Sequence, residues 1–229
     1  MRRIALINQK GGVGKTTITT NLGHALALAG HRVTVIDLDP QGQLASNFGL
    51  FRAPQKGIDR VLLNELELSS VRQGVRDLLT LIPAGSRLQE VEYLQDGGSS
   101  RAHLLRQALE SLSLDQDFVL FDCPPSAGLL VMNAIFAADE ALIPVSGLGL
   151  WMVLNRFFPR RKLCQEVEGK LRHHFAQQLL EIPIKESAVI AECPGVGRTI
   201  FEYRPSSHSA KEFRQLAEEI LSRKPNGLV

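Results

Sequence analysis

A glycine-rich segment from residue 8 to residue 17, NQKGGVGKTT, places the tightest constraint on the fold of this chain. An apolar run, Ile4 to Ile7, precedes it, and the stretch Ile18 to Ala29 after it has apolar residues at helical spacing. Glycines permit positive φ angles, so such a loop turns successive N–H groups inward and forms a concave surface suited to an anion. A strand, this loop and a helix in that order predict a phosphate-binding loop in an α/β domain.

The residues of this loop have separate expected roles. We expect Lys15 to reach the terminal phosphates of a bound nucleotide and the Thr16 hydroxyl to ligate Mg²⁺. The phosphate cradle itself is expected to comprise Gly11, Gly12, Val13, Gly14, Lys15, Thr16 and Thr17. The usual pattern has glycine where this chain has Gln9, and Lys10 adds a second cation. We hypothesise that the Lys10 side chain points away from its own loop and acts on a nucleotide held by a second copy of the chain, in a homodimer.

Three acidic residues follow the ends of two further predicted strands. Arg32 to Asp37 completes a βαβ unit with parallel strands, and Asp39 lies in the loop beyond it. The apolar run from Asp117 ends in Asp122. We expect Asp122 to hold Mg²⁺ together with Thr16, and Asp37 to act on the metal shell, either of them directly or through water. Asp39 is expected to orient or deprotonate a water; capping a turn is the open alternative for Asp37 and Asp39.

The length of 229 residues and a hydrophobic fraction of 44% suit one α/β domain, expected over residues 1–224 with a short flexible tail at 225–229. The three cysteines are far apart and form no C-x-x-C pair, so neither disulfides nor a zinc site is indicated, and a reducing cytoplasm fits best. The chain enters its first strand at once, without room for a signal peptide, and no apolar run is long enough to cross a bilayer.

The remaining pattern predicts a three-layer fold with a mostly parallel sheet flanked by helices. Further strands are expected at 78–83, 141–145, 150–156 and about 180–184, and helices at 86–94, 100–112, 126–138 with Ser126 as its cap, 163–175, 186–191 and 209–221. Residues 44–75 are mixed. Only a few residues around Gly147-Leu148-Gly149 separate strand 141–145 from strand 150–156, whereas parallel neighbours need a crossover of about a dozen or more. Three alternatives stay open: an antiparallel hairpin, a segment outside the sheet, or a lost crossover.

A formal net charge of +2 does not itself indicate nucleic acid, so any DNA-binding surface has to be local. The candidate phosphate contacts are Arg160, Arg161, Lys162, Arg198, Arg204, Lys211 and Arg214, followed by Arg223 and Lys224. No aromatic residues are interleaved with them and no recognition helix is evident, so binding would be independent of sequence. A solvated basic face is the alternative.

Three motifs together resemble the ParA/MinD ATPases, most closely the ParA type. The segment from Lys10 to Thr16 is similar to their deviant Walker A motif, Asp37-Leu38-Asp39-Pro40-Gln41 to their switch I, and Phe121-Asp122-Cys123-Pro124-Pro125 to their Walker B and switch II. The similarity continues in Leu154-Asn155-Arg156, like the adenine-contacting strand end of the family, and in residues 192–203, so it covers most of the chain.

The resemblance implies an ATP-bound sandwich dimer that binds DNA non-specifically, hydrolyses ATP weakly and is stimulated by a ParB-like or cargo adaptor, so the protein would be nucleoid-associated. It also implies that Lys10 and Lys15 contact phosphates, that Asp39 acts in hydrolysis, and that Asn155, with Arg156 beside it, contacts adenine. ParA-like proteins usually have a helical crossover where this chain has only Gly147-Leu148-Gly149.

Three other functions remain open at this stage. A MinD-like membrane-positioning ATPase would need an amphipathic membrane helix at the C-terminus, but the segment after Ser222 is short and contains Pro225. A metabolic P-loop enzyme would use Lys10 to meet a small-molecule substrate. An ATP-binding interaction module would bind nucleotide without turnover.

Overall fold

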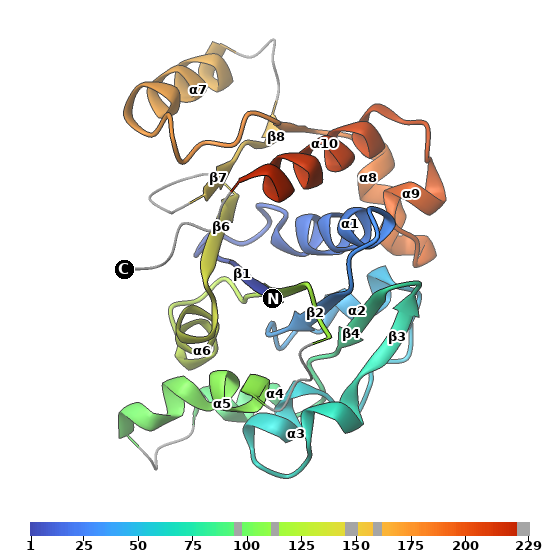
Figure 1. The fold of residues 1–229 in the computed structure, drawn as a ribbon, viewed down its shortest axis with the longest axis vertical. Coiled ribbons are helices and arrows are strands. Elements are labelled where there is room, and N and C mark those ends of the chain that lie inside the picture. The colour runs from blue at the N-terminus through green and yellow to red at the C-terminus, as the bar shows by residue number, and fades with distance from the viewer. Residues whose placement is uncertain (94–97, 111–114, 145–150, 158–161, 224–229) are drawn as a thin grey trace.

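A seven-stranded sheet in the order β3-β4-β2-β5-β1-β6-β7 organises the chain (Figure 1). The computed structural model describes residues 1–93, 98–110, 115–144, 151–157 and 162–223. The strands are β1 Arg2–Leu6, β2 Val33–Asp37, β3 Gln73–Arg76, β4 Leu79–Ile82, β5 Phe118–Asp122, β6 Glu140–Pro144 and β7 Trp151–Val153. All of them pair in parallel except β3, which is antiparallel to β4. The predicted mostly parallel α/β sheet is confirmed.

Helices cover both faces of this sheet (Figure 1). On one face α1 (Lys15–Leu28) and α10 (His208–Ser222) pack into the larger apolar core. The second core, on the other face, contains residues of α3 (Ile58–Leu62), α4 (Leu88–Glu92), α5 (Leu104–Glu110) and α6 (Leu129–Ala137). Every residue of β2 and β5 is buried, as expected for central parallel strands that are covered on both sides. Three layers are therefore present, as predicted.

The remaining elements are short, apart from α7. They are α2 Gln43–Asn47, α7 Lys162–His174, α8 Ala188–Glu192 and α9 Ile200–Tyr203, the 3₁₀ helices η1 Leu68–Val71, η2 Gly98–His103 and η3 Cys193–Val196, and a separate parallel pair of β8 Asn155–Phe157 with β9 Ile184–Lys185. None of the helices in the described ranges combines the length and the apolar character that a membrane span requires.

Several predicted elements differ from the structure. The expected strand 150–156 is two strands, β7 and β8, which pair with different partners, and the strand expected to end at Ile184 begins there as β9. Ser126 does not cap α6: Gly128 is the N-cap residue, and Glu92 of α4 accepts the N–H groups of Leu129 and Leu130 instead. Strand β3, at the end of the mixed stretch 44–75 and one residue beyond it, was not predicted, because an edge strand with one partner carries little apolar alternation.

Strands β6 and β7 are parallel neighbours, with Leu142 opposite Trp151 and Pro144 opposite Val153. This excludes the hairpin and places Trp151–Val153 in the sheet, whereas Asn155 and Arg156 belong to the separate β8–β9 pair. For the paired part of the segment, a lost crossover is the alternative that fits. The overlap of the two strands covers three residue pairs. Residues 145–150, which include Gly147-Leu148-Gly149, lie outside the described part of the chain, as do 225–229 of the expected tail.

A buried carboxylate holds this edge of the sheet together. Glu140, at the start of β6, is fully buried and accepts hydrogen bonds from Arg2 Nε at 2.8 Å and from Trp151 Nε1 at 2.8 Å. Arg2 also donates to the carbonyl oxygen of Ile220 in α10 at 2.6 Å. Side chains from β1, β6 and β7 and the backbone of α10 thus meet at one ion pair.

Candidate functional site

The loop between β1 and α1 has the geometry of a phosphate cradle. Gly12 and Gly14 have φ angles of 71° and 88°, which non-glycine residues rarely adopt. Within the described part of the chain, the N–H groups from Gly11 to Gly14 have no hydrogen-bond acceptor. The Lys15 ammonium is buried and donates to the backbone oxygen of Asn8 at 3.1 Å, which holds it beside the loop. Free donors and a buried cation together suit an anionic ligand.

Two carboxylates stand at the end of neighbouring strands beside this loop. Asp37 at the end of β2 is directly opposite Asp122 at the end of β5, and Asp122 is in turn opposite Leu6 of β1. Both aspartates are buried. Asp37 accepts the N–H groups of Asp39 and Leu44 at 3.1 Å each, so its charge is partly satisfied by the switch segment that follows it.

Asp122 is less completely satisfied. Its Oδ1 accepts from the Thr19 hydroxyl of α1 at 3.3 Å, while its buried Oδ2 has no hydrogen-bond partner among the described residues. A buried carboxylate oxygen without a partner is costly. A carboxylate oxygen left without a partner at the strand end beside the phosphate loop fits a divalent cation held next to phosphates.

Burial and neighbouring negative charge raise the pKa values of both carboxylates. The pKa of Asp122 is raised to about 7, mainly by burial and also by the charge of Asp39, while Thr16 and Lys15 oppose the shift. Burial, followed by the negative charge of Asp122, raises the pKa of Asp37 well above its usual range. A cation bound beside these two carboxylates would lower the pKa of both Asp37 and Asp122, because positive charge favours their ionised forms.

Asn155 approaches the same loop from β8. Its Nδ2 donates to the backbone oxygen of Val13 at 2.5 Å, and it occupies the space that a Cβ at position 14 would need. A small hollow of about 60 Å³ lies beside it, lined by Gly14, Thr17, Asn155, Ile184, Lys185, Glu186, Ser187, Ile190 and Ala191. The structure therefore brings Asn155 to the loop; Arg156 follows it in β8, and its side chain lies outside the described part.

The other predicted site residues lie at the rim. Asp39 is half-buried, and its Oδ1 accepts from the N–H of Gln41 at 3.0 Å, which shapes the turn as the alternative interpretation expects. The N–H of Asp39 donates to Asp37 Oδ1 at 3.1 Å, which keeps Asp39 next to the site. Lys10 is exposed; its N–H donates to Asn8 Oδ1, and its side chain has no partner among the described residues.

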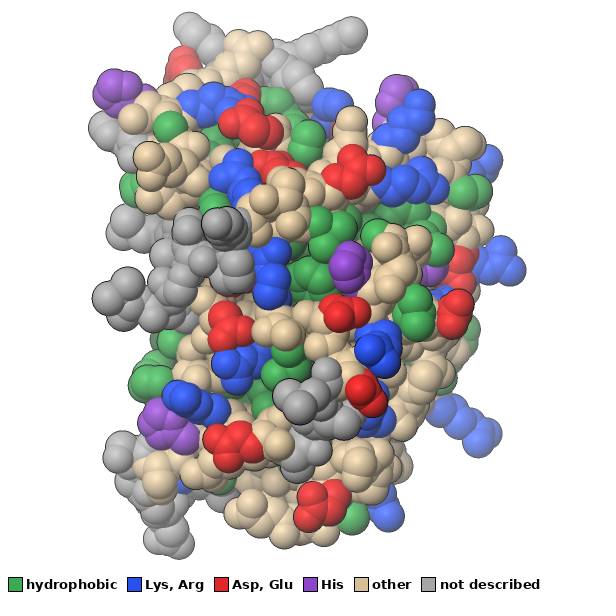
Figure 2. Space-filling model, in the orientation of Figure 1, with side chains coloured by type: hydrophobic (Ala, Val, Ile, Leu, Met, Phe, Trp, Pro, Cys, Tyr) green, Lys and Arg blue, Asp and Glu red, His purple; other side chains and the backbone are tan. Residues whose placement is uncertain are grey.

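The described candidate DNA contacts lie on more than one element. Arg204, Lys211 and Arg214 are exposed around the junction of α9 and α10, where Arg214 donates to the oxygen of Pro205. Arg198 is exposed near α1 and η3 instead. Arg160, Arg161 and Lys224 lie outside the described residues, as does the side chain of Lys162, and Arg223 is paired with Glu219. On the face seen in Figure 2, basic and acidic side chains are interspersed, so a DNA surface there would be local.

The structure adds three residues with contacts at or behind the site that were not predicted. Asn8 holds both the Lys15 ammonium and, through its own amide, the oxygen of Pro144 in β6. Thr19 fixes one oxygen of Asp122, and Glu92 fixes the start of α6 behind the Asp122 loop. Asn8 and Thr19 flank the glycine motif closely enough to be suspected from sequence, whereas Glu92 carries no local signal.

The chain is similar to known proteins in both sequence and fold. A family model with the description "AAA domain" matches residues 1–150. The chromosome-partitioning ATPase Soj of Thermus thermophilus is 36% identical, covering 97% of this chain and 96% of that protein. The chromosome partitioning protein ParA of Myxococcus xanthus is 32% identical, covering 97% and 88%. A crystal structure named as cobyrinic acid a,c-diamide synthase of Mycobacterium smegmatis, with a bound ATP analog and magnesium, is 27% identical with a TM-score of 0.82 over 100% of both chains.

The lengths of these alignments bear on the short β6–β7 connection. The alignment with the Thermus thermophilus protein runs over 249 positions and this chain has 229 residues in all, so at least 20 aligned positions of that relative have no counterpart here. One crossover needs about a dozen residues or more. The difference in length is therefore sufficient for a missing crossover.

Proposed function

Because the chain belongs to the ParA/Soj family of P-loop partition ATPases, we propose that it forms a dimer with ATP, binds DNA non-specifically and hydrolyses ATP to position a cargo. The observation that carries this proposal is the combination of free N–H donors from Gly11 to Gly14 with the unpartnered Oδ2 of Asp122. The donors suit phosphates, and the carboxylate suits the magnesium that accompanies them. The Mycobacterium smegmatis structure holds both kinds of group.

Each residue of the site has a role in this proposal. The loop N–H groups and Lys15 bind and orient the phosphates, and Lys15 stabilises the negative charge that develops on them during transfer. Mg²⁺, when bound, supplies further positive charge there; Thr16 and Asp122 would hold it, with Asp37 in its outer shell. Asp39 at the rim orients or deprotonates the attacking water, and Asn155 contacts the adenine side of the nucleotide.

Lys10 has a separate role across a dimer. Its side chain is exposed and has no partner in its own described chain, which leaves it free to meet the nucleotide of a second copy. Two subunits that face each other across two nucleotides would each lend one Lys10 to the other. Turnover would then require dimerisation, so a monomer holds ATP without rapid hydrolysis.

The DNA surface is drawn from Arg198, Arg204, Lys211 and Arg214, with Arg160, Arg161 and Lys162 as further candidates. Contacts from lysine and arginine to phosphates give affinity that is independent of sequence and falls steeply with salt. We expect a cytoplasmic, nucleoid-associated protein, and a ParB-like or cargo adaptor that raises the weak basal turnover. A membrane role is disfavoured because α10, the amphipathic C-terminal helix of the described chain, buries its apolar residues in the core.

The test is ATP turnover measured with and without DNA and with the product of the neighbouring gene, together with molecular mass in ATP and in ADP. We expect a dimer in ATP, a monomer in ADP, and faster turnover when DNA and the adaptor are both present. Lys10→Ala is expected to lose the dimer and the stimulated turnover. If Lys10→Ala keeps both, its role across the dimer is wrong, and if DNA is not retained in ATP, the partition function is wrong.

A metabolic P-loop enzyme is the second candidate, because a solved structure of the same fold is named as a diamide synthase. In that case Lys10 would meet a small substrate in the same subunit. An amidated or phosphorylated small product, formed at a rate that DNA does not change, would favour this function over partition.

A further inference from the structure

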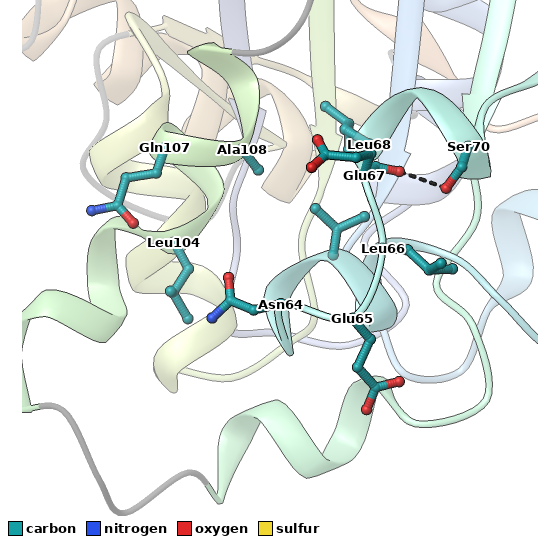
Figure 3. A pocket seen from close by; sticks show the side chains of 10 residues that line it. Asn64, Glu65, Leu66, Glu67, Leu68, Ser70, Leu104, Gln107 and Ala108 are labelled. Atoms are coloured by element: carbon teal, nitrogen blue, oxygen red, sulfur yellow. Dashed lines mark hydrogen bonds between the residues drawn. The ribbon is translucent and has the colours of Figure 1, made fainter.

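The largest hollow of the described surface lies away from the phosphate loop. It opens between α5 and the segment that joins α3 to β3, and its volume is about 640 Å³ (Figure 3). None of the nucleotide-site residues lines it, and its acid Glu65 is already paired with Arg60 and Arg87. A residue that controls Lys10 has to lie closer to the loop, and Asn8 contacts Lys10 directly.

Asn8, where β1 runs into the phosphate loop, uses three polar groups at once. Its Oδ1 accepts the N–H of Lys10 at 2.9 Å, and its Nδ2 donates to the carbonyl oxygen of Pro144 at the end of β6. Its backbone oxygen accepts a hydrogen bond from the Lys15 ammonium at 3.1 Å. The Asn8 side chain therefore serves Lys10 and β6, whereas Lys15 contacts only the backbone, which a substitution of the side chain leaves in place.

Asparagine combines the two properties that these contacts need. Its short side chain lets the carbonyl oxygen reach the N–H two residues further on, as in an Asx turn, while the amide N–H group stays free to donate. An ionised aspartate has no donor, and a serine hydroxyl is too short to reach both partners. The position therefore selects asparagine for two simultaneous hydrogen bonds.

The outer side of the loop has little other support from its own chain. Among the described residues, no other side chain hydrogen-bonds to the backbone of residues 9–12, and a Cβ at Gly11 or Gly12 would meet no described atom within 4 Å. The Lys10 side chain is exposed on this side. The space next to Lys10 is open to a second copy, and the direction in which Lys10 leaves the loop depends on Asn8.

The end of β6 is a firm anchor for this contact. Strand β6 pairs with β1 on one side and with β7 on the other, and Pro144 is part of the pairing with β7. The backbone N–H of Ile7 donates to the oxygen of Leu142 at 3.2 Å. The Asn8 amide therefore continues the β1–β6 ladder by one step after the backbone has left the sheet.

We propose that Asn8 is a positioning residue for Lys10. Its carbonyl oxygen fixes the Lys10 backbone, and its amide ties that point to the end of β6, so the free Lys10 side chain is presented to the nucleotide of the second copy. The inference rests on the proposed function, since it explains how Lys10 is held for its role across the dimer. Small displacements of a group that acts on phosphates are costly, which is why the loop needs such a tie.

The test is a double-mutant cycle between Asn8 and Lys10. Molecular mass over a concentration series in a slowly hydrolysed ATP analog measures the dimer. We expect Asn8→Ala to weaken the dimer about tenfold, because Lys10 is no longer held in place. In the Lys10→Ala chain the same change should weaken it less than about twofold, because the residue that Asn8 positions is gone. The affinity of the monomer for a fluorescent ATP analog should stay within about threefold, since Lys15 and the loop N–H groups remain.

Two further variants sharpen the cycle. In Asn8→Ser the hydroxyl can still accept the Lys10 N–H but cannot reach Pro144, so its dimer should be stronger than that of Asn8→Ala and weaker than that of the wild type. Asn21→Ala is the matched control, because Asn21 also bridges two backbone groups, the oxygen of Thr17 at 2.9 Å and the N–H of Ile200 at 2.8 Å. Any loss in Asn21→Ala should add to that of Lys10→Ala. Thermal unfolding would check that each variant folds, and Asn8→Ser carries the cycle if Asn8→Ala does not fold.

The outcomes separate this proposal from the proposed function. If Lys10→Ala weakens the dimer but Asn8→Ala does not, or if their losses add, the positioning role of Asn8 is overturned and the role of Lys10 stands. Equal losses in Asn8→Ser and Asn8→Ala would also overturn it. If Lys10→Ala has no effect, the role across the dimer is wrong and this inference is wrong with it. DNA retention in ATP decides the partition function separately.

Discussion

Two regions of the same sheet are held together in different ways. One is the nucleotide edge, formed by the carboxyl ends of β1, β2 and β5 beside the phosphate loop, and the other is the β6–β7 edge at the side of the sheet. At the nucleotide edge, β5 pairs over five residues with both β1 and β2, and the backbone ladder alone fixes where Asp37 and Asp122 stand. At the other edge, β7 pairs over only three residues, and the Arg2–Glu140–Trp151 side chains secure it. A ladder tolerates the loss of a side chain, whereas a buried ion pair does not.

The largest effect is expected from Lys15→Ala at the nucleotide edge. The variant removes the cation that stabilises charge on the phosphates, so turnover should fall about 1,000-fold, as for the loss of comparable transition-state contacts. The ladder should hold the fold, so the free energy of unfolding should change little. Phosphate release and urea unfolding measure the two effects. A loss of less than tenfold would mean that the loop is not the catalytic phosphate site.

Arg2→Ala is expected to have the opposite profile at the β6–β7 edge. It leaves the fully buried carboxylate of Glu140 without its cation, which should lower the free energy of unfolding by about 3 kcal/mol. Arg3→Ala is the matched control, since its partner Asp139 is 30% exposed and the pair should be worth less than about 1 kcal/mol. Equal losses in the two variants, measured by urea unfolding, would remove the distinction between the edges.

The third prediction concerns pH at the nucleotide edge. The pKa of Asp122 in the folded chain is raised to about 7, above its value in the unfolded chain, so folding favours its protonated form. Without nucleotide and magnesium, stability should therefore decrease as pH rises from the unfolded pKa to the folded one. Asp122→Asn cannot ionise, so it should gain about 2 kcal/mol relative to wild type between pH 5 and pH 8. A pH-independent difference in urea unfolding would contradict this.

The smallest effect is expected from Asn155→Ala, which lies where the two regions meet. Its amide donates to Val13 in the loop, and one such hydrogen bond contributes about 1 kcal/mol. The variant should weaken ATP binding about fivefold with little change in unfolding. Titration with a fluorescent ATP analog would measure it, and an unaltered affinity would mean that β8 only neighbours the site.

The success of the sequence-based predictions differs between the same two regions of the sheet. The sequence located the parts of the site that directly follow or end a buried strand, because an apolar run marks where such a strand ends. These parts are residues 8–17, Asp37 and Asp122. The strand 150–156 was wrong as one element, because an apolar run does not reveal that its halves pair with different neighbours. The contacts of Glu140 and Glu92 were not predicted, because Arg2 is 138 residues from Glu140 and Glu92 is 37 residues from Leu129.

The place of β1 in the sheet also determines the order in which the site is completed during synthesis. Strand β1 is made first but lies between β5 and β6, so no neighbour is available to it until residue 118 has left the ribosome. The phosphate loop and α1 emerge about a hundred residues before Asp122, and contacts of such long sequence separation form slowly. A nascent chain stopped before β5 would therefore carry the complete glycine motif without a nucleotide site.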